Sequence, residues 1–196
     1  MNLDLNHVAF WMDAIRSSPD PARTLESFWK GQLKSKEWLI KNLRKHVHKV
    51  VSIDIHGGWN GVLASMLFQS DIVVTRITSL DIDPACESIA NTMNKIEEMT
   101  GHFKAVTADM CRTNSTADVI INTSCEHISQ AQYDFWLDGM PQDSLIVLQS
   151  NNYYIPEHIR PVDSLEEFVE QSHINVIWKG ELELPLYKRF MLIGKK

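Results

Sequence analysis

The stretch VVSIDIHGGWNG, from Val50 to Gly61, decides the fold of this 196-residue chain. It is mainly apolar up to Ile53, reaches an acid at Asp54 and then breaks into His-Gly-Gly-Trp-Asn-Gly. An apolar run that ends in glycines is typical of a buried strand that enters a tight turn, where the missing Cβ lets backbone approach a ligand. Apolar residues follow at helical spacing, so the stretch predicts a strand, a turn and a helix beginning near Asn60.

Short apolar runs and helical segments alternate through the rest of the chain. The runs lack polar alternation, which is typical of strands buried on both faces of a parallel sheet. Pro185 to Tyr187 form a short link between the last two runs, and this favours an antiparallel pair. We therefore predict an α/β fold with a doubly wound, mostly parallel seven-stranded sheet, an antiparallel last strand and helices on both faces. The predicted strands cover residues 49–55, 76–82, 103–107, 117–122, 144–149, 174–184 and 188–196.

Three helical segments are expected before the sheet. Apolar residues recur at helical spacing in residues 3–16, and a second segment includes Leu25 to Trp29. Ser35 is placed to cap a third helix. We expect Trp29 or Trp38 to fold over a ligand crevice as part of a lid.

Two later helices carry clear terminal signals. Asp83 suits the cap of a helix that Gly101 closes, with Pro84 at its first position. Ser164 has capping-box spacing to Glu167 and predicts a helix through about residue 173.

The composition excludes several classes of protein. The chain holds 19 basic and 25 acidic residues, a net charge of −6, which argues against a nucleic-acid surface. Three cysteines with no close pair argue against a disulfide framework and favour a reducing compartment. No apolar run has the length of a membrane span, and the N-terminus lacks a signal pattern. We expect a soluble, cytoplasmic protein without a membrane partner; the oligomeric state stays open.

Asp81 lies at the end of the second predicted strand, some 23 residues after Gly58. This is close to the separation at which an acid after a glycine turn meets a ribose. A carboxylate there accepts two hydrogen bonds from sugar hydroxyls. The alternative is that Asp81 and Asp83 only end a strand and cap a helix.

Four motifs in order resemble those of the class I S-adenosylmethionine-dependent methyltransferases. VVSIDIHGGWNG is similar to the acid-plus-glycine loop of that family, and SLDID to its ribose-binding acid. FKAVTADMC resembles the strand and aspartate that contact the adenine amine, and ADVIINTSCEHI resembles the end of the fourth strand, where cofactor and substrate meet.

The resemblance implies S-adenosylmethionine as cofactor and a Rossmann-like domain over residues 49–196. Residues 1–48 would be an N-terminal helical extension that serves as a cofactor or substrate lid, within one structural domain overall. The cofactor-binding residues that it implies are Asp54, His56, Gly57, Gly58, Trp59, Asp81, Ile82, Asp109, Met110, Asn122 and Ser124.

The sequence departs from the family pattern at three places. His56 stands where the first loop glycine is usual, and Trp59 puts a bulky ring where a small residue is common. The fourth motif also lacks the Asn/Asp-Pro-Pro-Tyr/Phe of enzymes that methylate base nitrogens. This again disfavours a nucleic-acid acceptor.

Glu126 and His127 are the candidate catalytic residues, as base and orienter for an acceptor. Neighbours in an extended turn point apart, so we expect only one of them to face the pocket; the alternative is a helix cap beside a surface imidazole. Cys125 is expected to be a small apolar filler. No metal site is expected, because His46 and His48 form the one tight histidine pair and no other ligand stands near them in sequence.

The sequence therefore predicts an S-adenosylmethionine-dependent methyltransferase acting on a small molecule or a protein side chain. The alternative is a non-methylating S-adenosylmethionine enzyme or a catalytically inactive cofactor-binding subunit. A nicotinamide-dependent dehydrogenase fits less well, because the glycine spacing is not G-x-G-x-x-G and the chain is short for a separate substrate domain.

Overall fold

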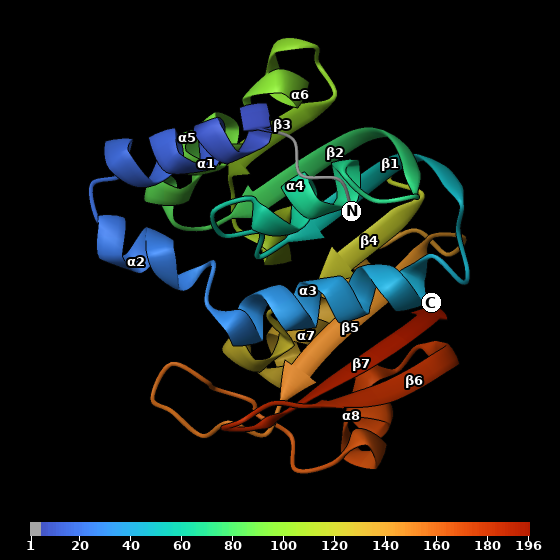
Figure 1. Cartoon of the computed structure of the whole chain (residues 1–196). Coiled ribbons are helices and arrows are strands. Elements are labelled where there is room, and N and C mark those ends of the chain that lie inside the picture. The colour runs from blue at the N-terminus through green and yellow to red at the C-terminus, as the bar shows by residue number, and fades with distance from the viewer. Residues whose placement is uncertain (1–4) are drawn as a thin grey trace.

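The computed structural model describes residues 5–196 and contains a seven-stranded sheet of order β3-β2-β1-β4-β5-β7-β6 (Figure 1). The first five strands run parallel, and β7 pairs antiparallel with both β5 and β6. The predicted α/β architecture is confirmed. The strands are β1 (Lys49–His56), β2 (Val73–Asp81), β3 (Phe103–Thr107), β4 (Val119–Asn122), β5 (Leu145–Asn151), β6 (Asn175–Glu183) and β7 (Lys188–Lys195).

Helices cover both faces of the sheet (Figure 1). The α-helices are α1 (Leu5–Ser17), α2 (Pro21–Glu26), α3 (Lys30–Leu43), α4 (Val62–Phe68), α5 (Pro84–Met93), α6 (Lys95–Met99), α7 (Gln130–Asp138) and α8 (Leu165–Ser172). Two single 3-10 turns, η1 (Met110–Arg112) and η2 (Cys125–His127), follow β3 and β4. None of these helices is both long and apolar enough to cross a membrane.

Alternate residues of the central strands enter two separate cores. Ile121 of β4 and Val147 of β5 pack in one core with residues of α3, α4 and α5. Ile120 and Ile146, one position earlier in each strand, pack in the other core with α7 and α8. Both sides of these strands are buried, which explains why their sequence shows no polar alternation.

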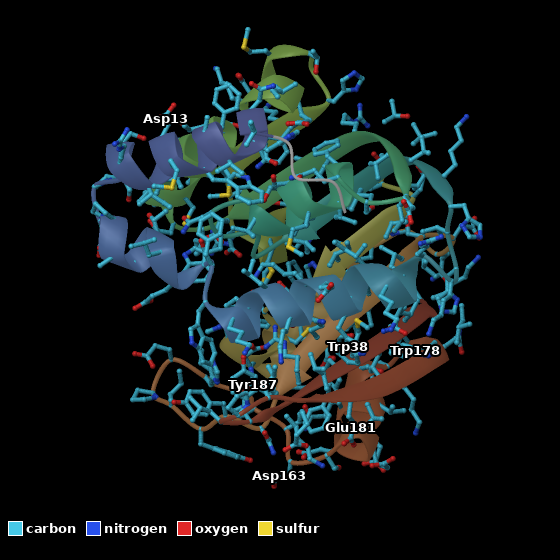
Figure 2. The ribbon with its side chains drawn as sticks, in the orientation of Figure 1. Asp13, Trp38, Asp163, Trp178, Glu181 and Tyr187 are labelled. Atoms are coloured by element: carbon cyan, nitrogen blue, oxygen red, sulfur yellow. The ribbon has the colours of Figure 1, made fainter. Side chains whose placement is uncertain are left out.

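The N-terminal helices pack on the rest of the chain. In Figure 1, α1 lies alongside α5, and α3 crosses the face of the sheet. The prediction that Ser35 caps α3 is wrong: the helix begins at Lys30, and Ser35 lies inside it. The buried Ser35 hydroxyl donates to Gln149 Oε1 at 3.1 Å. Trp38 packs edge-on against Trp178 of β6, with ring centroids 6.0 Å apart (Figure 2).

The helix predicted from Asp83 to Gly101 is divided at Asn94 into α5 and α6. Asn94 has φ −111° and ψ 39°, and its buried amide donates to the carbonyl oxygens of Ala90 and Gly61 at 2.9 and 3.1 Å. The bond to Gly61 ties this break to the start of α4. The other predicted ends hold: Asp83 caps α5, and Ser164 caps α8.

Candidate functional site

A cavity of about 780 Å³ opens at the carboxyl ends of β1, β2, β4 and β5, next to α2 and α3. This edge is where α/β sheets bind ligands, because the parallel strands end together there and their loops diverge. Two groups of side chains line the cavity. One follows β1, β2 and β3, and the other follows β4 and β5 and includes residues of β7 and α3.

The glycine loop after β1 forms one wall. Gly57 has φ +68°, a conformation that favours glycine. A Cβ on Gly58 would lie 1.9 Å from Ser79 Oγ, and one on Gly57 would lie 2.5 Å from Ser124 Oγ. These glycines are therefore required by their packing against neighbouring side chains as well as by any ligand.

Asp81 is held at the end of β2 with its carboxylate in the cavity wall. Its Oδ2 accepts the backbone N–H of Trp59 at 2.8 Å, and its Oδ1 accepts that of Asp83 at 3.0 Å. Trp59 has φ +49°, in the left-handed region, where it donates its backbone N–H to Asp81. Each carboxylate oxygen has a second lone pair, so both can still accept a hydroxyl from a ligand.

The residues after β3 complete this half of the cavity. Asp109 and Met110 line it, together with Ile82, whose side chain is exposed. Asp109 accepts the backbone N–H of Cys111 at 2.9 Å through Oδ1. Arg23 of α2 pairs with Asp83 at 2.6 Å, and this pair places the N-terminal helices against the loop after β2.

Three of the predicted cofactor residues do not line the cavity. Asp54 accepts the hydroxyl of Ser115 at 2.6 Å. His56 is fully buried, and its Nδ1 accepts the indole N–H of Trp136 at 2.6 Å; burial lowers the pKa of His56 to about 4. Asn122 is also fully buried, and its Oδ1 accepts the backbone N–H of Ser124.

The remaining predicted residues are brought together in the cavity wall. The cofactor set contributes Gly57, Gly58, Trp59, Asp81, Ile82, Asp109, Met110 and Ser124, and the catalytic pair contributes Glu126 and His127. Glu126 and His127 both face the cavity, contrary to the expectation that only one would. The reason is local: residues 125–127 form a 3-10 turn, not an extended segment.

Glu126 belongs to a buried polar network. It is 3% exposed, and its Oε1 accepts from Arg189 Nη1 at 2.5 Å and from Asn151 Nδ2 at 2.6 Å. Arg189, on β7, also donates to the carbonyl oxygen of Thr123 and, at 3.4 Å, to Gln149 Oε1. The network joins β4, β5 and β7 at the floor of the cavity.

Two histidines stand beside Glu126. His127 and His158 meet edge to face, with ring centroids 4.8 Å apart. His158 lies in the loop after β5. Cys125, by contrast, is fully buried, and burial raises its pKa to about 12, in agreement with its predicted role as a filler.

Sequence reasoning missed Lys36, His158 and Arg189. Lys36 donates to Gln32 Oε1 at 2.8 Å, and burial, aided by the neighbouring Arg189, lowers its pKa to about 7. Arg189 carried one signal: it is a charged residue at the start of an otherwise apolar strand. The other two residues lie in segments whose sequence shows no sign of a site.

Aromatic residues also line the cavity. Tyr153 and Tyr187 stack with ring centroids 5.4 Å apart, and Tyr187 lies at the turn between β6 and β7 (Figure 2). Trp29, 43% exposed, lines the cavity from the N-terminal side. Trp38 does not reach it, so of the two predicted lid residues Trp29 is the one at the crevice.

No protein-family model and no curated protein matches this sequence. Solved structures match in fold. Magnesium protoporphyrin IX methyltransferase of Synechocystis PCC 6803, solved with SAH, gives a TM-score of 0.67 at 11% identity, over 97% of this chain and 94% of that one. Burkholderia thailandensis 1,6-didemethyltoxoflavin-N1-methyltransferase, solved with 1,6-didemethyltoxoflavin and S-adenosylhomocysteine, gives 0.67 at 11% identity, over 100% and 92%.

The pyocyanin biosynthetic protein PhzM gives a TM-score of 0.65 at 15% identity, over 95% of this chain and 62% of that one. The chain thus spans 62% of PhzM, and it spans 60% of the mitomycin 7-O-methyltransferase. At these identities the likeness establishes the fold: this chain has the fold of class I methyltransferases, as the sequence motifs predicted.

Proposed function

We propose that this protein binds S-adenosylmethionine in the cavity and transfers its methyl group to a small molecule or a protein side chain. The observation that carries the proposal is the arrangement of Asp81, whose two carboxylate oxygens are fixed by backbone N–H groups of the adjoining loops while facing the cavity. A preset carboxylate beside a glycine turn is the arrangement that recognises a ribose.

The cofactor would occupy the half of the cavity that follows β1, β2 and β3. Asp81 would accept the ribose hydroxyls, and Asp109 would accept the adenine amine. The backbone of Gly57 and Gly58 would lie against the amino-acid end. Trp59 would cover the sugar from the side where its N–H reaches Asp81.

The second half of the cavity is suited to an acceptor. Ligand pockets range over about 300–1,000 Å³, and this cavity of about 780 Å³ lies in the upper part of that range. Methyl transfer breaks the S–CH₃ bond, forms a bond from CH₃ to the acceptor, and leaves the electron pair on sulfur. The protein therefore mainly has to align the nucleophile and take up its proton.

Glu126 and His127 would serve the acceptor. Both line the cavity floor, and Glu126 is fixed by Arg189 and Asn151. The two methyltransferases described above are named for small molecules, magnesium protoporphyrin IX and 1,6-didemethyltoxoflavin, which supports a small-molecule acceptor here. The net charge of −6 disfavours a nucleic-acid acceptor.

The compartment is part of the proposal. Cys86, Cys111 and Cys125 are all free, and burial raises the pKa of Cys86 to about 12, so its thiol is inert. Three unpaired cysteines favour a reducing compartment such as the cytoplasm.

Calorimetry with S-adenosylmethionine and S-adenosylhomocysteine tests the cofactor, and label transfer from methyl-labelled cofactor to a panel of small molecules and peptides tests the reaction. We expect micromolar binding and methylation of at least one acceptor class. Absence of binding at millimolar cofactor would overturn the proposal. Binding with the label retained on the cofactor throughout would favour a non-methylating enzyme or an inactive subunit.

A further inference from the structure

Three side chains at the floor of the cavity have the composition of a metal site. One ligand atom each from Glu126, His127 and His158 lies within 4.8 Å of the other two. Glu126 and His127 come from η2, after β4, and His158 comes from the loop after β5. All three line the cavity.

The two imidazoles are oriented as metal ligands are. His127 Nδ1 lies 3.0 Å from the carbonyl oxygen of Glu157, and His158 Nδ1 lies 2.6 Å from that of Tyr153. A carbonyl oxygen only accepts, so Nδ1 is the donor in each ring, and in a neutral imidazole the lone pair is then on Nε2. Metal-binding histidines are fixed in this way, with the second ring nitrogen bonded to a carbonyl or a carboxylate.

Glu126 gives an independent indication. Its Oε1 is held by Arg189 and Asn151, but its buried Oε2 has no hydrogen-bond partner within residues 5–196. A side chain that is 3% exposed rarely leaves a carboxylate oxygen without a partner, because desolvation of that oxygen is costly. A cation between Oε2 and the imidazoles would supply the partner.

We propose that Glu126, His127 and His158 bind a divalent first-row transition-metal ion through one carboxylate oxygen and two imidazole nitrogens. This donor set suits Zn²⁺, Co²⁺, Fe²⁺ or Mn²⁺. Three ligands on one side leave coordination positions open toward the cavity, as in catalytic sites. The proposal departs from the sequence-based expectation of no metal, because His158 lies far from Glu126 in the chain and only the fold joins them.

The ion's role would rest on the proposed function. An acceptor oxygen or nitrogen in an open position would be fixed in front of the methyl group. The positive charge would also lower the pKa of an acceptor hydroxyl, so that its proton leaves to solvent before the C–O bond forms. The acceptor class is then a small molecule that carries a metal-coordinating hydroxyl.

The site itself is tested with the metal alone. Chelator-treated protein is titrated with Co²⁺, followed by visible absorption, and with Zn²⁺, followed by calorimetry. We expect one equivalent to bind, with imidazole ligation in the Co²⁺ spectrum. In His127→Ala and His158→Ala the affinity should fall about tenfold or more.

His102→Ala is the matched control. The Nδ1 of His102 also lies 2.7 Å from a backbone carbonyl, that of Thr75, but its ring is outside the cavity lining. This variant should bind the metal as the unmodified chain does. Circular dichroism melts of the variants separate loss of ligand from loss of fold, and His127 is exposed enough to be replaced safely.

If the unmodified chain does not bind metal stoichiometrically, the proposed site is wrong. An equal loss of metal affinity in His102→Ala and His158→Ala would also contradict it. S-adenosylhomocysteine binding is measured on the same samples. Metal binding without cofactor binding would leave the site standing and refute the proposed function. Cofactor binding without metal binding would refute the metal site and leave the proposed function standing.

Discussion

Trp59 donates its backbone N–H to the carboxylate of Asp81, 2.8 Å away, and this bond joins the glycine loop after β1 to the end of β2. A ribose bound at Asp81 would therefore contact two loops at once. We expect Asp81→Ala to weaken S-adenosylhomocysteine binding at least tenfold, since it removes about 1.5–3 kcal/mol of charged hydrogen bonding. Calorimetry measures this, with the exposed Asp71→Ala as control. Equal affinity in the two variants would refute the ribose role.

Gly58 should tolerate a methyl group poorly, for a reason that a second substitution can remove. A Cβ there would meet Ser79 Oγ at 1.9 Å, so Gly58→Ala should cost about 1–2 kcal/mol of stability, and Ser79→Ala should restore part of it. Gly101 is the contrasting case: it has φ +76°, and no atom lies within 4 Å of its Cβ position. The stability lost in Gly101→Ala should therefore come from backbone strain alone. Urea unfolding of Gly58→Ala and Gly101→Ala, each with and without Ser79→Ala, tests this. Adding Ser79→Ala should not reduce the stability loss caused by Gly101→Ala.

His56 should make the protein sensitive to acid. Burial lowers its pKa from 6.5 to about 4, so between these values the unfolded chain binds a proton that the folded chain does not. Stability therefore falls as the pH drops from 6.5 to 4, by up to about 3 kcal/mol from this group. Unfolding free energies measured across this range should show the loss.

His56→Gln should flatten that loss, whereas the exposed His102→Gln should leave it unchanged. An identical pH profile in His56→Gln and the unmodified chain would contradict the assignment. Because Gln can still accept from the Trp136 indole, the variant tests the charge more than the hydrogen bond.

The ion pair of Arg189 and Glu126 should be costly to break from one side only. Arg189 is 8% exposed, so Arg189→Met would leave a buried carboxylate unpaired and cost about 3–5 kcal/mol. The double variant with Glu126→Gln should recover part of this loss. Arg44→Met is the control, since its partner Asp71 is exposed and the pair should contribute under about 1 kcal/mol. Thermal melts in the presence of chelator measure the differences.

The sheet was predictable from sequence because its information is local. Each central strand is an apolar run of the right length, and the short link at residues 185–187 fixed the direction of the last pair. Helix ends at Asp83 and Ser164 were also predictable, because the capping residue lies next to the helix that it caps.

The errors came from tertiary contacts. The break at Asn94 depends on a bond to the carbonyl of Gly61, and the interior position of Ser35 depends on its bond to Gln149. The residues at the cavity floor were also missed because tertiary contacts bring them together. The glycine loop and Asp81 could be found by their spacing, but His158 and Arg189 reach Glu126 only through the order of the strands.

The position of β7 has a consequence for folding during synthesis on the ribosome. This strand is made after β5 and β6 but lies between them, so β6 leaves the ribosome before the neighbour to which it hydrogen-bonds exists. Arg189, whose guanidinium forms the ion pair with Glu126, is on β7 and is therefore also synthesised late. A nascent chain halted before Lys188 would thus lack both β7, which joins β5 to β6, and the arginine that pairs with Glu126.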